Sequence, residues 1–200
     1  MKTSSMYKNI FFTLLSCILL TKTFSQLHFP SDPDSAVFLT SDISLFWQCF
    51  DAYQKDSTKN PFGRYIREGS LGVKGFIPYR IISDTHLYQT VRTRSKDYLA
   101  VRTRTDSMRL KEMQCRSSFY ALKYWYPAAK FPPVYFVIGA FNSGGTFNET
   151  GIFIGAEKQT DVRGVPYIVA HELIHFQQTT WKESPTLVEQ SIVEGSASFL

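Results

Sequence analysis

The chain has 200 residues, of which 44% are hydrophobic, 16% aromatic and 20% charged. This composition suits a globular domain with a buried core and excludes a low-complexity or intrinsically disordered chain. The formal net charge is +5. Three of the lysines lie in an N-terminal segment that we expect to be removed, which leaves 19 basic against 17 acidic residues. So small an excess gives little support to nucleic-acid binding, and we expect no nucleic-acid partner.

Residues 1–25 have the pattern of a secretory signal peptide. Lysines precede an apolar run of eleven residues, Ile10 to Leu20, which is too short to span a bilayer. Small residues at positions 23 and 25 fit a cleavage site before Gln26. We therefore expect a secreted or periplasmic, cell-envelope protein.

A lipoprotein signal is the alternative interpretation of this segment. The stretch from Leu14 to Cys17 resembles a lipobox, in which Cys17 would be lipidated and would anchor the protein to a membrane. Cleavage before Gln26 leaves two cysteines, Cys49 and Cys115. They could form a disulfide in an oxidising compartment or remain two separate buried thiols.

The region from 26 to 130 is predicted to be mainly helical. A helix is expected from Ser41, short helices after Asn60-Pro61, and longer helical stretches over 83–106 and 108–125. Apolar residues at spacings of three and four indicate the first of these helices. They are Ile43, Phe46, Trp47 and Phe50.

The sequence pattern changes over 131–200, where it predicts strands followed by helices. Residues 132–139 and 150–155 are β-branched and aromatic, which predicts two strands that form a hairpin or lie as neighbours in a small sheet. A loop is expected over 142–146, and Glu157 is expected at a solvated strand end. Pro166 fits only the first turn of a helix, so a helix should begin near Gly164. The predicted fold class is α+β.

The helix from Gly164 is apolar almost all round, which predicts burial. Inside it lie His171, Glu172 and His175. Residues four apart share one face of a helix, so the two histidines can bind one ion. Glu172 lies beside them, where its carboxylate can take a proton from a water that the metal activates. The spacing predicts one Zn²⁺ ion and a catalytic Glu172.

A catalytic zinc usually has three protein ligands. Ser184-Pro185 predicts the start of a second helix after a short turn around Trp181 to Glu183. The downstream candidates are Glu183, Glu189 and Glu194. Glu183 lies in the turn and Glu189 only about one turn below it, whereas Glu194 lies as far down the second helix as the histidines lie down the first. Glu194 is therefore the predicted third ligand.

His171-Glu172-Leu-Ile-His175, followed after eighteen residues by Glu194, resembles the HExxH-x18-E pattern of gluzincin metallopeptidases. Glu194-Gly195 resembles the glutamate helix of the M1 aminopeptidase-like group. The wider layout is similar to exported bacterial proteins predicted to be zinc-dependent proteases. The resemblance implies a zincin-like core that hydrolyses a peptide or protein substrate, with His171, His175 and Glu194 as zinc ligands. It also implies that the preceding strand, through Gly151, Ile152, Phe153 and Ile154, is the edge on which substrate backbone pairs.

The sequence departs from the family in three places. No Gly-x-Met-Glu-Asn motif occurs over 140–160, so aminopeptidase specificity is not implied. Ser198 stands where many gluzincins have an acidic residue that orients a zinc ligand. The family takes an oxyanion-stabilising Tyr or His from a later segment, and this sequence ends at Leu200, so we expect a C-terminally truncated core. The oligomeric state is left open.

Two other hypotheses compete with a peptidase. One is a catalytically weak or inactive zincin-like envelope protein that binds or assembles other components. The other is a buried helix without metal, whose histidines hydrogen-bond inside the protein.

Overall fold

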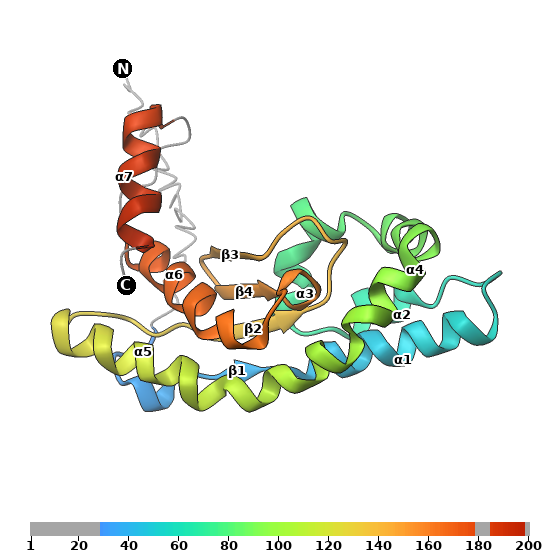
Figure 1. Ribbon diagram of the computed structural model, residues 1–200, viewed down its shortest axis with the longest axis horizontal. Helices are drawn as coiled ribbons and strands as arrows, with labels where there is room; N and C mark the ends of the chain where they lie inside the picture. Colours follow the sequence, from blue (N-terminus) through green and yellow to red (C-terminus); the bar gives the residue numbers. More distant parts are fainter. Residues whose placement is uncertain (1–28, 179–184, 199–200) are drawn as a thin grey trace, which may run out of the picture.

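The computed structural model describes residues 29–178 and 185–198 (Figure 1). The expected signal segment, Cys17, the cleavage site before Gln26 and the expected turn at Trp181 to Glu183 lie outside the described residues. Within the described residues, no helix has the length and apolar character that a membrane crossing requires.

The fold combines many helices with one small sheet, in agreement with the predicted α+β class. The α-helices are α1 (Ser41–Lys55), α2 (Phe62–Glu68), α3 (Leu71–Phe76), α4 (Asp84–Asp106), α5 (Glu112–Trp125), α6 (Val165–Gln177) and α7 (Leu187–Ala197). The strands are β1 (Phe38–Leu39), β2 (Val134–Val137), β3 (Gly145–Asn148) and β4 (Gly151–Gly155). A π-helical turn, η2 (Ile77–Ile81), follows α3.

The four strands form one mixed sheet in the order β1-β2-β4-β3. The first three are parallel to one another, and β3 is antiparallel to β4. The two strands predicted from sequence are therefore parallel neighbours, and the hairpin alternative was wrong. The hairpin joins β3 to β4, and β3 begins at Gly145, inside the stretch predicted as a loop.

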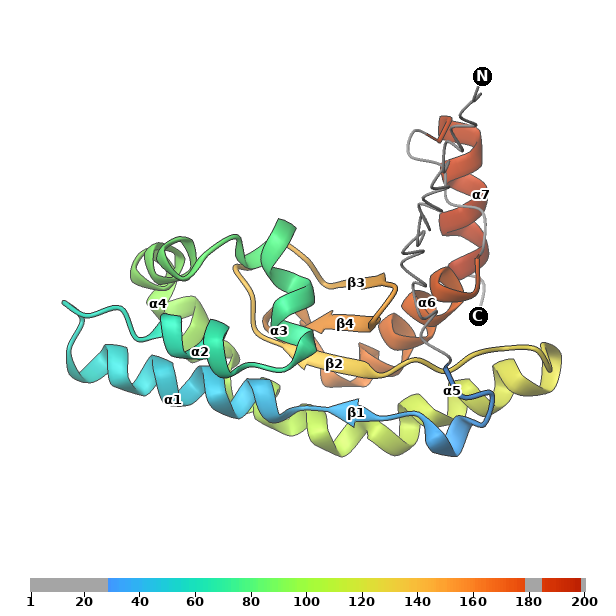
Figure 2. The same cartoon turned by 180° about the vertical axis from the view of Figure 1, so that it is seen from behind.

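Helices cover both faces of this sheet (Figure 2). On one face, α3 approaches so closely that a Cβ on Gly72 would overlap Tyr135, and a Cβ on Gly75 would overlap Phe153. These two glycines allow the close helix–sheet approach. On the other face, α6 packs against β3 and β4, and α5 packs against α6. Because α6 packs directly against β3 and β4, the residues on its sheet-facing side contact the hairpin.

The helical region and the sheet share one hydrophobic core, to which residues on both sides of position 130 contribute. Two buried tyrosines connect them: the Tyr65 hydroxyl donates to the Ile138 carbonyl at 3.0 Å, and the Tyr98 hydroxyl donates to the Gly139 carbonyl at 2.7 Å. Cys49 and Cys115 are both buried and free, so the described residues contain two separate thiols rather than a disulfide.

Glu157 is buried, and the prediction of a solvated strand end was wrong: only 2% of the residue is exposed. Its Oε1 accepts the Phe141 N–H at 3.1 Å, and its Oε2 is buried without a hydrogen-bond partner. Burial raises the pKa of Glu157 to about 7, against the lowering effect of the backbone N–H groups that it accepts. Phe141 has a φ of 61°, which is uncommon for a residue with a side chain. Glu157 therefore holds a strained loop that leads into β3.

Candidate metal centre

Helix α6 carries the two histidines in its last two turns. Gly164 caps it and Pro166 lies in its first turn, as the sequence predicted. Val165, Val169 and Leu173 are buried in the common core. This packing fixes the helix under the sheet, so that the other side of its C-terminal half faces β3 and α7.

Helix α7 brings the third side chain. Its N-cap is Thr186 rather than the predicted Ser184-Pro185: the Thr186 hydroxyl accepts the Glu189 N–H at 3.2 Å, and Glu189 Oε2 accepts the Thr186 N–H at 2.9 Å. This reciprocal pair is a capping box. Glu194 nevertheless lies about two turns into α7, which packs against α6.

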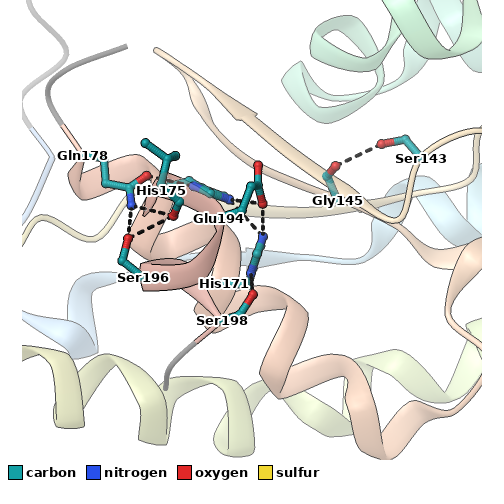
Figure 3. A network of polar contacts seen from close by, with 9 residues as sticks. Ser143, Gly145, His171, His175, Gln178, Glu194, Ser196 and Ser198 are labelled. Atoms are coloured by element: carbon teal, nitrogen blue, oxygen red, sulfur yellow. Dashed lines mark hydrogen bonds and ion pairs between the residues drawn. The ribbon is translucent and has the colours of Figure 1, made fainter. Parts of the chain in front are cut away.

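The side chains of His171, His175 and Glu194 point toward one another (Figure 3). The two histidine Nε2 atoms are 2.9 Å apart, and Glu194 Oε2 lies 3.3 Å from the Nε2 of His175 and 3.4 Å from that of His171. The group is one that could hold a metal ion, since its ligand atoms lie within 4.8 Å of one another. The spacing of the sequence and the geometry of the structure therefore point to the same three residues.

Gln178 determines which nitrogen of His175 faces the cluster. The Gln178 Nε2 donates to the Val193 carbonyl at 3.1 Å and to the Ser196 hydroxyl at 2.9 Å, so its Oε1 must be the atom that lies 2.8 Å from His175 Nδ1. An amide oxygen only accepts, so Nδ1 carries the proton and Nε2 has a lone pair directed at the cluster. The same amide joins the end of α6 to α7.

His171 is also available as a neutral ligand. Partial burial is the largest cause that lowers its pKa, followed by the neighbouring His175, while Glu194 acts in the opposite direction. The Ser198 hydroxyl lies 3.4 Å from His171 Nδ1. Ser198 therefore stands at the outer nitrogen of His171, at a distance that is long for a hydrogen bond.

Glu172 is directed away from the ligand cluster and toward β3. It is buried, with 6% of the residue exposed, and a Cβ on Gly145 would overlap its Oε1 and lie 2.9 Å from its Cγ and Cδ. Its pKa is raised to about 7, chiefly by burial and also by the Glu194 charge, against the lowering effect of the Arg80 charge. Glu172 is therefore a carboxyl whose proton affinity suits proton transfer near neutral pH.

The strand that borders the site is β3, and the expectation that Gly151, Ile152, Phe153 and Ile154 form an open edge was wrong. Those residues lie in β4, which pairs with β2 on one side and with β3 on the other, and all are buried. The sheet ends at β3. Gly145 of this strand touches Glu172, and the Phe147 ring stacks on His175 with centroids 6.0 Å apart.

Two residues of the site escaped the sequence analysis. Gln178 follows His175 by three positions, a spacing that returns to the same helix face and could have indicated a partner. Gly145 lies in a Gly-Gly stretch that was predicted as a loop, and only its pairing with Ile154 of β4 shows that it begins a strand.

Comparisons with family models, with curated proteins and with solved structures gave no match to this chain.

Proposed function

We propose that this chain is a zinc-dependent peptidase of gluzincin type, built on a zincin-like core and exported from the cytoplasm. The observation that carries the proposal is the convergence of His171, His175 and Glu194 from two neighbouring helices. The resemblance of the sequence pattern to gluzincins gives the class of reaction.

The three residues fit a zinc ion. Zinc bonds of about 2.0–2.1 Å in tetrahedral geometry separate the ligand atoms by about 3.3 Å. The two distances from Glu194 match this value, and the histidine pair is closer at 2.9 Å. Two neutral imidazole lone pairs and a carboxylate repel one another at such distances unless a cation lies between them. Zinc, when bound, would polarise the peptide carbonyl and acidify the attacking water.

The chain supplies the proton acceptor next to this centre. Glu172 follows the first ligand directly but faces β3, so its carboxylate can accept a proton from water without binding the metal. Burial keeps its pKa near 7, which suits a group that takes a proton from water and gives it to the leaving amine. Gly145 has no side chain where the Glu172 carboxylate lies, so the glycine makes room for the base.

Substrate backbone would pair with β3, the strand that ends the sheet over the cluster. A peptide extended along β3 would pass both Glu172 and His175, because Gly145 and Phe147 contact those two residues. This assigns to β3 the role that the sequence had assigned to residues 151–154.

The test is the Glu172→Gln variant of the full chain loaded with zinc. It should bind one equivalent of zinc like the wild type and lose hydrolysis of a mixed peptide library by about 100- to 10,000-fold, the usual contribution of a general base. Peptidase activity retained in this variant would refute the role of Glu172.

A zincin-like envelope protein with little or no activity is the second candidate. The 3.4 Å separation of Ser198 from His171 favours it, since a weakly held ligand orients a metal poorly. Stoichiometric zinc in a wild-type chain that cleaves nothing in the same library would support this candidate instead.

A further inference from the structure

A cavity lies on the other side of β3 from the candidate site. Its volume is about 500 Å³, and it lies between the β3–β4 hairpin and the helical segment formed by α3 and η2. Thr146 and Phe147 contribute one wall, and Lys74 and Arg80 lie on the other. Because Phe147 also stacks on His175, the strand that borders the cavity is the same strand that borders the metal ligands.

Two cations that line this cavity form no salt bridge with any described residue. Within residues 29–178 and 185–198, neither Lys74 nor Arg80 forms a salt bridge, and neither side chain has a hydrogen bond in the protein. The Arg80 Nε is buried and unsatisfied. Glu149 lines the cavity as well, but it is exposed at the tip of the hairpin. A buried N–H donor without a partner is costly, which indicates a ligand acceptor at this position.

The backbone that carries Arg80 is held in place. Arg80 lies in η2, a π-helical turn, and such turns are frequent at functional sites. The Asn142 side chain donates to the Arg80 carbonyl at 2.9 Å, which ties the turn to the loop that leads into β3. Three residues after Asn142 comes Gly145, the residue against Glu172. The Arg80 backbone is thus tied to the loop that enters β3 at Gly145.

We infer that Arg80, assisted by Lys74, binds a carboxylate of the substrate close to the scissile bond. Peptides with a carboxylate close to the scissile bond are therefore the substrate class, and Arg80 is a specificity-determining residue. The inference rests on the proposed peptidase function, because only a peptidase has a substrate with a scissile bond. The binding of a carboxylate itself does not depend on hydrolysis. A planar guanidinium suits a carboxylate because two N–H groups donate in parallel. The carboxylate can come from an Asp or Glu side chain on either side of the bond, or from the C-terminus of the peptide.

Equilibrium binding separates this inference from the peptidase proposal. Fluorescein-labelled hexapeptide pools would be titrated with the zinc-loaded Glu172→Gln full chain and followed by fluorescence anisotropy. In one pool, Glu occupies each position of the hexapeptide in turn, and in the matched neutral pool Gln occupies the same positions. A second pair of pools compares a free C-terminus with an amidated one, which distinguishes the side-chain source from the terminal source.

We expect the Glu pool or the free-carboxylate pool to bind at least about tenfold more tightly than its neutral match, as for a charge-assisted hydrogen bond. Adding Arg80→Gln should remove this ratio, Arg80→Lys should retain part of it, and Lys74→Gln should reduce it. The matched control is Arg104→Gln, because Arg104 is also a partly buried arginine with a buried, unsatisfied Nε but does not line this cavity. Thermal unfolding of each variant would verify folding.

Equal ratios in the Arg80→Gln variant and its parent would overturn the inference, and so would equal binding of each pool and its neutral match, or the absence of binding by any pool. If the wild type cleaves nothing while the Arg80-dependent ratio persists, the peptidase proposal fails and the carboxylate site stands.

Discussion

The two helices that supply the candidate ligands differ in how the protein holds them. Helix α6 is fixed by the sheet on one side and by α5 on the other, and His175 on it is only 4% exposed. Helix α7 packs mainly on α6, and Leu187, Val188 and Ile192 along it are more than 60% exposed. The carboxyl of Glu194 is half exposed. The core therefore preforms one half of the candidate site, whereas docking of the other half depends on a few polar contacts and, when present, on the metal.

Two separate variants, each lacking the ligand of one helix, test this difference most strongly. His175→Ala and Glu194→Gln should each weaken zinc binding on the order of 1000-fold, because each removes one of three ligands. The metal-free proteins should differ: His175→Ala leaves a buried gap and an unpaired Gln178 oxygen, which costs about 2 kcal/mol of unfolding free energy. Glu194→Gln should change the unfolding free energy by less than about 0.5 kcal/mol. Zinc titration and urea unfolding measure the two effects, and equal destabilisation by both variants would contradict the comparison.

The buried half of the molecule also has a pH dependence, through Glu157. Its pKa in the folded protein is about 7, above the ordinary value of 4.5. Its contribution is therefore fully favourable below pH 4.5 and is lost as the pH rises through 7. Glu157→Gln mimics the protonated acid. Its unfolding free energy relative to that of the wild type should therefore rise by on the order of 3 kcal/mol as the pH increases from 4.5 to 8. Urea unfolding at these two pH values measures the difference, and a gain independent of pH would exclude ionisation as its cause.

Gly145 tests the contact between the sheet and α6. A Cβ at this position overlaps the Glu172 carboxyl, so Gly145→Ala should displace the base by about 1 Å and lower kcat/KM by about 100-fold with zinc binding unchanged. Gly144→Ala is the matched control, since its Cβ would have as nearest neighbour the Gln159 Nε2 at 3.6 Å, an ordinary contact. If the two variants have the same activity, Glu172 does not act from the position next to β3.

Gln178 connects the two halves and should give the smallest effect. Gln178→Leu removes the acceptor of His175 Nδ1 and both donors to α7. We expect zinc affinity to fall about tenfold, the lower end for loss of a group that orients a ligand. Gln177→Leu is the control on the neighbouring residue, whose amide bonds to Lys130 instead. Similar zinc affinities for both leucine variants would remove Gln178 from the site.

The sequence predicted the parts of this molecule that depend on local chemistry. Pro166 gave the start of α6 because proline tolerates only the first turn, and the i, i+4 spacing gave the histidine pair. Glu194 followed from helix rise alone, even though the N-cap was misplaced by two residues: Ser184-Pro185 and Thr186 are both good starting signals, and only the reciprocal bonds of Glu189 decide for Thr186.

The features that depend on contacts between residues far apart in the sequence could not be predicted in this way. Nothing local in residues 151–154 shows that they are paired on both sides, because a short apolar run looks the same in a central strand and in an edge strand. The burial of Glu157 arises from a loop and helices far away in the sequence. Arg80 approaches Glu172 only because η2 and the loop before β3 are joined through Asn142.

The most direct test is a zinc titration of the metal-free full chain, combined with X-ray absorption at the zinc edge. We predict one tightly bound zinc per chain, with two imidazole nitrogens and one carboxylate oxygen in its shell, and with the oxygen contribution weakened in Glu194→Gln. A chain that binds no zinc, or one whose zinc affinity and spectrum are unchanged in Glu194→Gln, would contradict the convergence of α6 and α7 on a single metal ion.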